Sequence, residues 1–152
     1  MTARVDEGAA ASTGSSVELD LVGDRLVRAA IRLSGVCERF VGRPLALRRN
    51  EYLILHAVAD QPWINACRLA EVLDVAPPNM SVFLDDLQRR KLIHRESDPS
   101  DRRAKRICLT DHGQSVLDEA VRALREGERG VFGQLTEVDR AMLLSLLEQL
   151  RA

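Results

Sequence analysis

Apolar side chains recur every three or four positions along most of the chain, which is the spacing of amphipathic helices. The first such stretch begins at Leu19, and Gly42 and Pro44 are expected to end it. Its apolar positions are Val22, Leu26, Ala30, Leu33, Cys37 and Phe40. A second, mostly apolar helix is predicted over residues 50–59, and a short extended segment over residues 62–64. The first third of the chain is therefore expected to be mainly helical.

Two shorter helices joined by a tight turn follow. Asn65 is a good N-cap for a helix that runs to Leu73, because its side chain can accept a hydrogen bond from a free backbone N–H. Residues 74–76 form the turn, and Pro77 and Pro78 suit the first turn of the next helix, which is predicted to reach about residue 90. The expected inward positions are Leu69, Ala70, Leu73, Met80, Phe83, Leu84 and Leu87. A short helix, a tight turn and a second helix make a helix–turn–helix.

A two-stranded hairpin is predicted next. Its strands are residues 92–96 and 105–109, and the turn formers Asp98, Pro99, Ser100 and Asp101 lie between them. Ile93, Ile107 and Leu109 are the expected inward residues. Arg102 and Arg103 lie at or beside the tip, so the hairpin has the form of a basic finger that fits a DNA minor groove.

Two further helices complete the chain. Thr110 is expected to cap the first of them, and Gly127, Gly130 and Gly133 to end or bend it. Thr136 with Asp139 resembles a capping box for the last helix. The apolar positions of these helices are Val116, Leu117, Ala120, Val121, Leu124, Met142, Leu143, Leu146, Leu147 and Leu150. The first and last helices are too apolar to cover one small lobe alone, and a two-fold dimer would bury the excess.

Composition narrows the classes of function. Of the 152 residues 45% are hydrophobic, enough for a core, and only 3% are aromatic, which argues against sugar-binding and base-stacking surfaces. The formal net charge is −1, yet residues 89–106 hold eight basic and three acidic side chains. The rest of the chain is therefore acidic. Such a localised basic patch directs a phosphate backbone to one face, although a charge run can also be a solvated surface.

Cysteine usage and the N-terminus indicate a compartment. The three cysteines Cys37, Cys67 and Cys108 form no CxxC pair, and residues 1–16 lack the apolar region of a signal peptide. We expect a mobile tail over residues 1–16, reduced thiols, no membrane segment and a soluble cytoplasmic protein. The histidines are scattered without a metal-ligand or catalytic pattern, so no enzyme, cofactor or metal is expected. The only potential metal ligands close together in the sequence are His94, Cys108 and His112, and their spacing fits no known pattern.

These elements resemble the MarR family of bacterial transcriptional regulators. The residues that carry the resemblance are Arg68-Leu69-Ala70, Leu87, Leu92-Ile93, Arg95, the segment 98–103 and the segment 109–113. The resemblance implies a mainly α fold with a small β-hairpin wing. It also implies a homodimer built by terminal helices, palindromic operators, and release by a small molecule or by oxidation. The expected parts are dimerisation helices over 17–46 and 110–152 and a winged helix–turn–helix lobe over 47–109.

The expected contacts with double-stranded DNA lie on the helix after Pro77 and on the wing. Asn79 can pair with adenine through two hydrogen bonds, Ser81 with a base edge or phosphate, and Val82 with a thymine methyl. The predicted DNA-binding residues are Arg68, Pro78, Asn79, Ser81, Val82, Arg95, Asp101, Arg102, Arg103 and Lys105. For Asn79 and Ser81 the alternative is helix solubility, and for the wing it is a solvated loop.

Two positions depart from the family's pattern, and two acids oppose phosphate contact. Val82 stands where the family often has a basic residue, and Lys91 stands where it commonly has glycine in a left-handed conformation. Asp85 and Asp86 follow on the same helix, so we infer that affinity depends on Arg68, the wing and the end of the helix.

The signal that controls binding is less defined. The family's pocket lies between the dimer helices and the DNA-binding lobe, and the candidate effector residues are Arg32, Cys37, Arg39, Tyr52, His56 and Trp63. A cation with phenolic and imidazole donors suits an aromatic or phenolic acid, although Tyr52 and His56 can equally be packed core. Cys37 would be a peroxide sensor if Arg39 lowered its pKa, and otherwise a buried inert thiol. A winged-helix protein–protein adaptor, which would show no salt-dependent DNA binding, is the remaining alternative.

Overall fold

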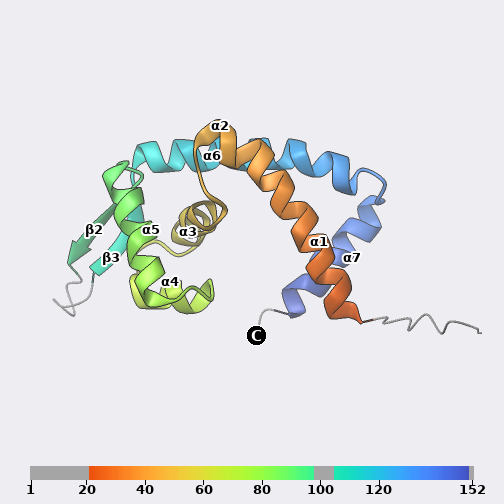
Figure 1. Ribbon diagram of the computed structural model, residues 1–152, viewed down its shortest axis with the longest axis horizontal. Helices are drawn as coiled ribbons and strands as arrows, with labels where there is room; N and C mark the ends of the chain where they lie inside the picture. Colours follow the sequence, from red (N-terminus) through yellow and green to blue (C-terminus); the bar gives the residue numbers. More distant parts are fainter. Residues whose placement is uncertain (1–20, 98–104, 151–152) are drawn as a thin grey trace, which may run out of the picture.

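A computed structural model describes residues 21–97 and 105–150 of the chain (Figure 1). The elements are α1 (Val22–Cys37), the π-helix η1 (Glu38–Gly42), α2 (Arg43–Leu45), α3 (Arg49–Asp60), β1 (Ile64–Asn65), α4 (Ala66–Val72), α5 (Pro77–Arg89), β2 (Ile93–Ser97), β3 (Lys105–Leu109), α6 (Asp111–Phe132) and α7 (Glu137–Gln149). The mainly α fold with a small β wing is confirmed. In Figure 1 the long helix α6 spans the molecule, with α3, α4, α5 and the sheet toward one end and α1 and α7 toward the other.

The first helix runs further than predicted. The expectation that Gly42 and Pro44 end it is wrong, because α1 continues without a break through η1 into α2. Pro44 lies at the start of α2, directly after the π-helix η1, and does not end the helical path. The helical path ends instead at Ala46, whose φ of 48° is left-handed.

Of the late glycines in α6, Gly127 serves close packing. A Cβ on Gly127 would lie 2.5 Å from Cγ1 of Val36 and 2.6 Å from the ring of Phe40, so glycine is needed where α1 and η1 cross α6. The helix passes through Gly127 and Gly130 and ends at Phe132, with Gly133 as its C-cap. Of the three glycines expected to end or bend this helix, only Gly133 marks its end.

The helix–turn–helix is confirmed. Asn65 caps α4 by accepting a hydrogen bond from the backbone N–H of Arg68 at 2.8 Å. Asp74, with a φ of 50°, turns the chain, and α5 begins with its two prolines. The inward side chains of both helices are buried as expected, with Leu69, Met80, Leu84 and Leu87 each at most 1% exposed. Phe83 and Leu73 are half-buried against the same core.

The sheet has three strands, one more than the predicted hairpin. β2 and β3 pair antiparallel with Arg95 opposite Ile107. β1 joins the other edge of β3, with Ile64 opposite Ile107. The extended segment predicted over 62–64 is thus a strand that begins two residues later, and β2 also begins one residue later than predicted. Lys91, just before β2, has the left-handed φ of 57° expected for its position.

One hydrophobic core unites the lobe and the first half of α6. Its fully buried side chains include Leu47, Ile54, Leu55, Leu92 and Ile107. Thr110 caps α6 by accepting from the N–H of Gly113 at 2.9 Å, and a Cβ on Gly113 would lie 1.9 Å from the carbonyl oxygen of Leu92. By contrast, no residue of α7 is buried.

Candidate nucleic-acid interface

The start of α5 presents the predicted reading residues to solvent. Pro78, Asn79 and Ser81 are exposed, and Val82 is 61% exposed, on the side of the helix opposite the buried Met80 and Leu84. The Ser81 hydroxyl donates to the carbonyl of Pro77 at 3.2 Å, which leaves its oxygen able to accept. An exposed amide, hydroxyl and isopropyl group on one helical turn match the donors, acceptors and methyl groups of a major groove.

Two of the predicted basic contacts are exposed on other elements. Arg68 on α4 is exposed, and its guanidinium donates to Glu71 at 3.1 Å. Lys105 at the start of β3 is exposed and donates to the hydroxyl of Ser97 at 2.8 Å. Exposed pairs of this kind contribute little to stability, so either cation can exchange its partner for a phosphate at small cost.

The Arg95 side chain is mostly buried and already paired, so it is less available to a phosphate than Arg68 or Lys105. Its side chain is 23% exposed and pairs with Asp85 at 2.8 Å. Its Nε is buried without a hydrogen-bond acceptor among the described residues. Contact with DNA stays a prediction for Arg95, as it does for all the predicted DNA-binding residues. Asp101, Arg102 and Arg103 lie outside the described residues.

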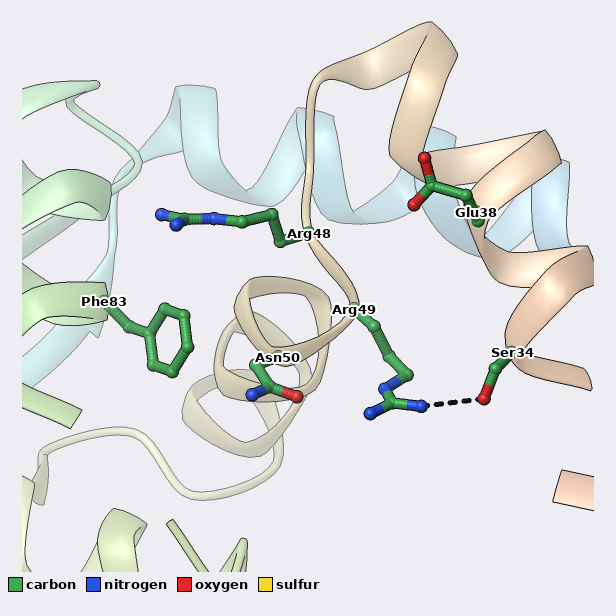
Figure 2. Close-up of a pocket in the computed structure, with 6 residues that line it drawn as sticks. All are labelled: Ser34, Glu38, Arg48, Arg49, Asn50 and Phe83. Carbon is green, nitrogen blue, oxygen red and sulfur yellow. Dashed lines mark hydrogen bonds between the residues drawn. The ribbon is translucent and has the colours of Figure 1, made fainter. Parts of the chain in front are cut away.

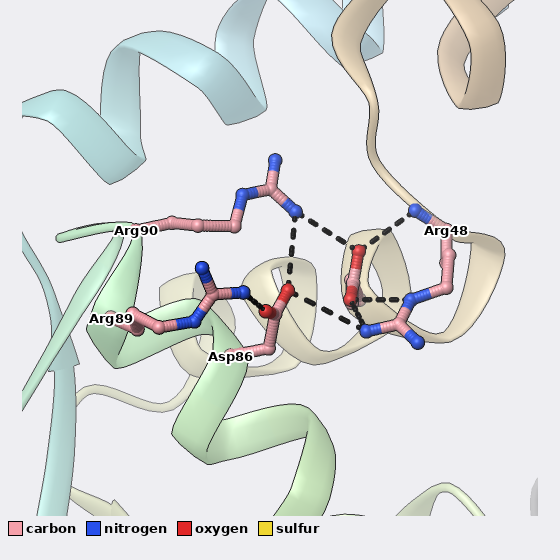
Figure 3. A network of polar contacts seen from close by, with 5 residues as sticks. Arg48, Asp86, Arg89 and Arg90 are labelled. Carbon is pink, nitrogen blue, oxygen red and sulfur yellow. Dashed lines mark hydrogen bonds and ion pairs between the residues drawn. The ribbon is translucent and has the colours of Figure 1, made fainter.

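Asp86, one of the two acids of α5, is held inside a network of ion pairs that the sequence did not predict (Figure 3). Glu51, fully buried on α3, accepts from the backbone N–H of Arg48 at 2.9 Å, from Nε of Arg48 at 2.6 Å and from Arg90 at 3.2 Å. Asp86 contacts Arg89, lies 3.5 Å from Nη2 of Arg48 and lies 3.6 Å from Arg90. The network joins the N-terminus of α3 to the C-terminus of α5.

Ionisation of this network follows from its contacts. Burial on its own raises the pKa of Asp86, but the hydrogen bond from Arg89 and the charges of the three neighbouring arginines outweigh it and hold this pKa below the usual value. The hydrogen bond to Glu51 raises the pKa of Arg48, so its guanidinium stays charged. Because Arg89 and Arg90 both engage Asp86, the end of α5 is less available to phosphates than the sequence implied.

A cavity of about 300 Å³ adjoins the network, between α1, the start of α3 and α5 (Figure 2). Its lining residues are Ser34, Glu38, Arg48, Arg49, Asn50 and Phe83. Arg49 donates to the hydroxyl of Ser34 at 2.7 Å, which links α3 to α1. The guanidinium carbon of Arg48 lies 5.3 Å from the centre of the Phe83 ring, a cation–π contact. The cavity therefore offers two cations and one aromatic ring.

The six predicted effector residues do not line this cavity. Tyr52 and His56 meet edge to face with ring centres 6.1 Å apart, and Cys37 adds to the effect of burial in raising the pKa of Tyr52, so these three lie near one another. Trp63 instead meets His94 of β2, with ring centres 6.2 Å apart. The side chains of Arg32, on α1, and Arg39, on η1, are both exposed.

The sequence held one signal for the residues that do line the cavity. Arg48 immediately precedes an apolar helical stretch, and Glu51 at the third helical position accepts from the backbone N–H of Arg48, which is the acidic half of a capping box. Placing the helix start at residue 50 rather than at Arg49 hid this pattern. Phe83 was assigned to the core alone, although it is only half-buried and faces the cavity.

The structure argues against a thiolate at Cys37. The thiol is buried, and burial is the main cause that raises its pKa; Arg49 opposes this shift, and Glu38 adds to it. Reactive cysteines have a lowered pKa and partial exposure, so Cys37 has the properties of an inert thiol. On the sheet, Cys108 lies 2.7 Å from Nε2 of His94, but no group of three or more potential metal ligands occurs among the described residues. No helix of residues 21–97 or 105–150 is long and apolar enough to span a membrane.

Comparisons with known proteins agree with this geometry. The model of the MarR family matches residues 47–105. The transcriptional regulator HosA of Escherichia coli O111:H- is 25% identical over 104 residues, which is 68% of this chain and 77% of HosA. The transcriptional repressor CouR, solved bound to a 23-mer DNA duplex, is 30% identical with a TM-score of 0.78 over 87% of this chain and 93% of CouR. Wild-type apo MarR from E. coli has a TM-score of 0.77 at 19% identity, over 88% of this chain and 98% of MarR. The chain belongs to the MarR family of DNA-binding transcriptional regulators.

Proposed function

We propose that the protein is a ligand-responsive repressor that binds a palindromic operator as a homodimer and is released by an aromatic or phenolic acid. In each lobe α5 enters the major groove with Asn79, Ser81 and Val82. The wing reaches the adjacent minor groove through Arg102 and Arg103, with Arg68 and Lys105 on the phosphates.

The observation that carries the proposal is the double role of α5. One side of its first turns presents Asn79, Ser81 and Val82 to solvent, while Phe83 on the same helix lines the cavity. A ligand in the cavity therefore contacts the element that reads DNA. Ligand binding can change DNA affinity only if the ligand interacts differently with the two arrangements of that element, and direct contact provides such a difference.

The homodimer is supported by apolar surface that the single chain leaves exposed. On α1, Val22 and Ile31 are 73% and 67% exposed, and on α7 and at its C-cap, Val138 and Leu150 are 72% and 65% exposed. A capping box of Thr136 and Asp139 fixes the start of α7, so the helix is well formed although none of its residues is buried. A second copy of the chain would cover these faces.

The ligand class follows from the cavity. Arg48 and Arg49 supply guanidinium groups that bind a carboxylate, and Phe83 supplies a face for an aromatic ring. Asn50 and the hydroxyl of Ser34 supply polar partners for a phenolic hydroxyl. The proposed effector site therefore consists of residues other than those expected from the sequence.

The test begins with selection of duplexes from a random DNA pool, followed by fluorescence-anisotropy titration of the enriched sequence. We expect an inverted repeat with half-sites about 10 bp apart, one helical turn. We further expect 4-hydroxybenzoate, but not its uncharged isostere 4-hydroxybenzamide, to weaken operator binding. Enrichment of no sequence would contradict the DNA-binding proposal, and an equal effect of both compounds would contradict the anionic effector.

A further inference from the structure

Arg48 belongs to two sites at once. Its Nε and Nη2 face the ion-pair network and contact Glu51 and Asp86. The same guanidinium lies over Phe83 and lines the cavity, and its side chain is 58% exposed. Among the described residues its Nη1 has no hydrogen-bond acceptor. One donor of Arg48 is therefore open to a ligand while the others hold the network.

The network has a surplus of positive charge that an anion can neutralise. Three arginines, Arg48, Arg89 and Arg90, face two carboxylates, Glu51 and Asp86. The cavity adds Arg49 and one carboxylate, Glu38, which lies 3.9 Å from Nε of Arg43. A single negative charge beside Arg48 would therefore complete the local balance without burying an unpaired charge.

The contacts of Arg48 differ in strength. Glu51 holds Arg48 by two side-chain contacts and one backbone contact, whereas Asp86 lies 3.5 Å from Nη2 alone. A carboxylate that binds the guanidinium from the cavity would compete first with the longer contact. Asp86 is on α5 and Arg48 immediately precedes α3, so loss of that contact removes one of the two ion-pair links between α3 and the end of α5. The other link, from Arg90 to Glu51, remains.

We propose that Arg48 couples the cavity to the recognition helix: a ligand carboxylate takes Arg48 from Asp86, and α5 leaves the position that binds DNA. This inference rests on the proposed function and names the device by which that site is regulated. Asp86 acts here as a positioning residue, because it contacts neither the ligand nor the DNA, whereas Arg48 binds the ligand and transmits its effect to Asp86. Linkage requires that operator binding weaken ligand binding by the same factor.

The test measures operator affinity with and without saturating 4-hydroxybenzoate in the full chain. The ratio of the two affinities is the coupling factor, which for allosteric proteins is typically about 5- to 150-fold. Asp86→Asn removes the charge for which the ligand competes and keeps the shape of the side chain. We expect its ligand-free operator affinity to move toward the ligand-bound value of the wild type, and its coupling factor to fall by at least about threefold.

The matched control is Asp85→Asn, the same change one residue earlier on α5. Asp85 pairs with Arg95 and not with the network, so the coupling factor should stay at the wild-type value whatever happens to the operator affinity itself. Arg48→Lys is a second variant in case Asp86→Asn does not fold. Its ammonium can bind the ligand but cannot bridge Glu51 and Asp86 as the guanidinium fork does, so ligand binding should persist while the coupling factor falls.

The outcomes separate this inference from the function beneath it. A reduced coupling factor in Asp86→Asn and Arg48→Lys, together with a wild-type factor in Asp85→Asn, supports the proposal. Equal coupling factors in all four proteins would overturn the role of Arg48 and leave the repressor function standing. A reduction in Asp85→Asn of the same size would also overturn it, as a general effect of changing α5. A wild type that binds no operator, or binds one without responding to the ligand, would overturn both.

Discussion

Gly113 is a position where one methyl group has a large expected effect. An added Cβ would meet the carbonyl oxygen of Leu92 at 1.9 Å, and backbone atoms there cannot move without disturbing the cap of α6. We expect Gly113→Ala to lower the free energy of unfolding by about 1–3 kcal/mol or more, as overpacking does. Urea denaturation followed by circular dichroism measures the change.

Gly130 provides the control for that experiment. It lies in the same helix with nothing within 4 Å of an added Cβ, and it is exposed. Gly130→Ala should raise the free energy of unfolding by roughly 0.5–1 kcal/mol, because alanine loses less conformational freedom in a helix. Equal effects of the two substitutions would show that α6 does not approach Leu92 as closely as described.

Asn79 and Arg103 are expected to affect binding in opposite ways. Asn79 is exposed at the start of α5, where an amide reads one adenine, so Asn79→Ala should relax preference at one base pair. The minor groove is degenerate, so Arg103→Ala should weaken binding by roughly 1–3 kcal/mol on every operator variant alike. Titration of both proteins against a panel of operator mutants makes the comparison. If Arg103→Ala binds as well as the wild type while its circular dichroism is unchanged, the wing is not a DNA contact.

Helix caps and backbone conformations of single residues could be predicted from the sequence. Ion pairs between residues far apart in the chain could not. Asn65 and Thr110 cap their helices as predicted, since a cap depends only on the next three residues. The left-handed Lys91 likewise follows from its place after a helix. The ion pair between Glu51 and Arg90 joins residues 39 positions apart, and nothing local marks it. The lining of the cavity was missed for the same reason.

At the scale of elements, the network holds α5 against α3, and its strength should depend on pH. The pKa of Asp86 in the folded protein lies below its usual value of 3.8, so its contribution to stability is present above that value and is lost as the pH falls through the folded pKa. We expect Asp86→Asn to be less stable than the wild type at pH 7, with the difference shrinking below about pH 4. Thermal unfolding of both proteins from pH 7 to pH 3 checks this; a difference that is constant over the range would contradict the ion pairs.

Some ends of helices and strands could not be predicted from the hydrophobic pattern. Pro44 was expected to end a helix, because proline lacks an N–H, but it stands at the start of α2, directly after the π-helix η1, and the helical path continues to Leu45. Ile64 and Asn65 form a strand because β3 offers them a partner some forty residues later, and two residues carry no period of their own. The helix–turn–helix, with caps and breakers at both helices, was placed almost to the residue.

At the scale of the molecule, the exposed apolar faces of α1 and α7 indicate an interface with a second copy of the chain. Leu146 and Leu150 are 54% and 65% exposed in the single chain. Replacing both with Asp would bury charges in the proposed interface, so we expect the double variant to sediment as a monomer at micromolar concentrations at which the wild type is a dimer. Val72→Asp, at a valine 48% exposed on α4, is the control and should remain dimeric. Sedimentation velocity measures the oligomeric state of all three proteins. A wild type that sediments as a monomer would contradict the homodimer.

Binding of DNA through the basic face of this lobe is tested most directly by the salt dependence of operator affinity. Each phosphate contact releases a counterion, so the logarithm of affinity should fall linearly with the logarithm of salt concentration. For about 6–10 phosphate contacts, affinity should drop by roughly 10³–10⁵ between 50 and 200 mM salt. Anisotropy titrations of the selected duplex measure the slope. An affinity that is unchanged over this range would mean that the arginines and lysines of the lobe and wing do not contact the phosphate backbone.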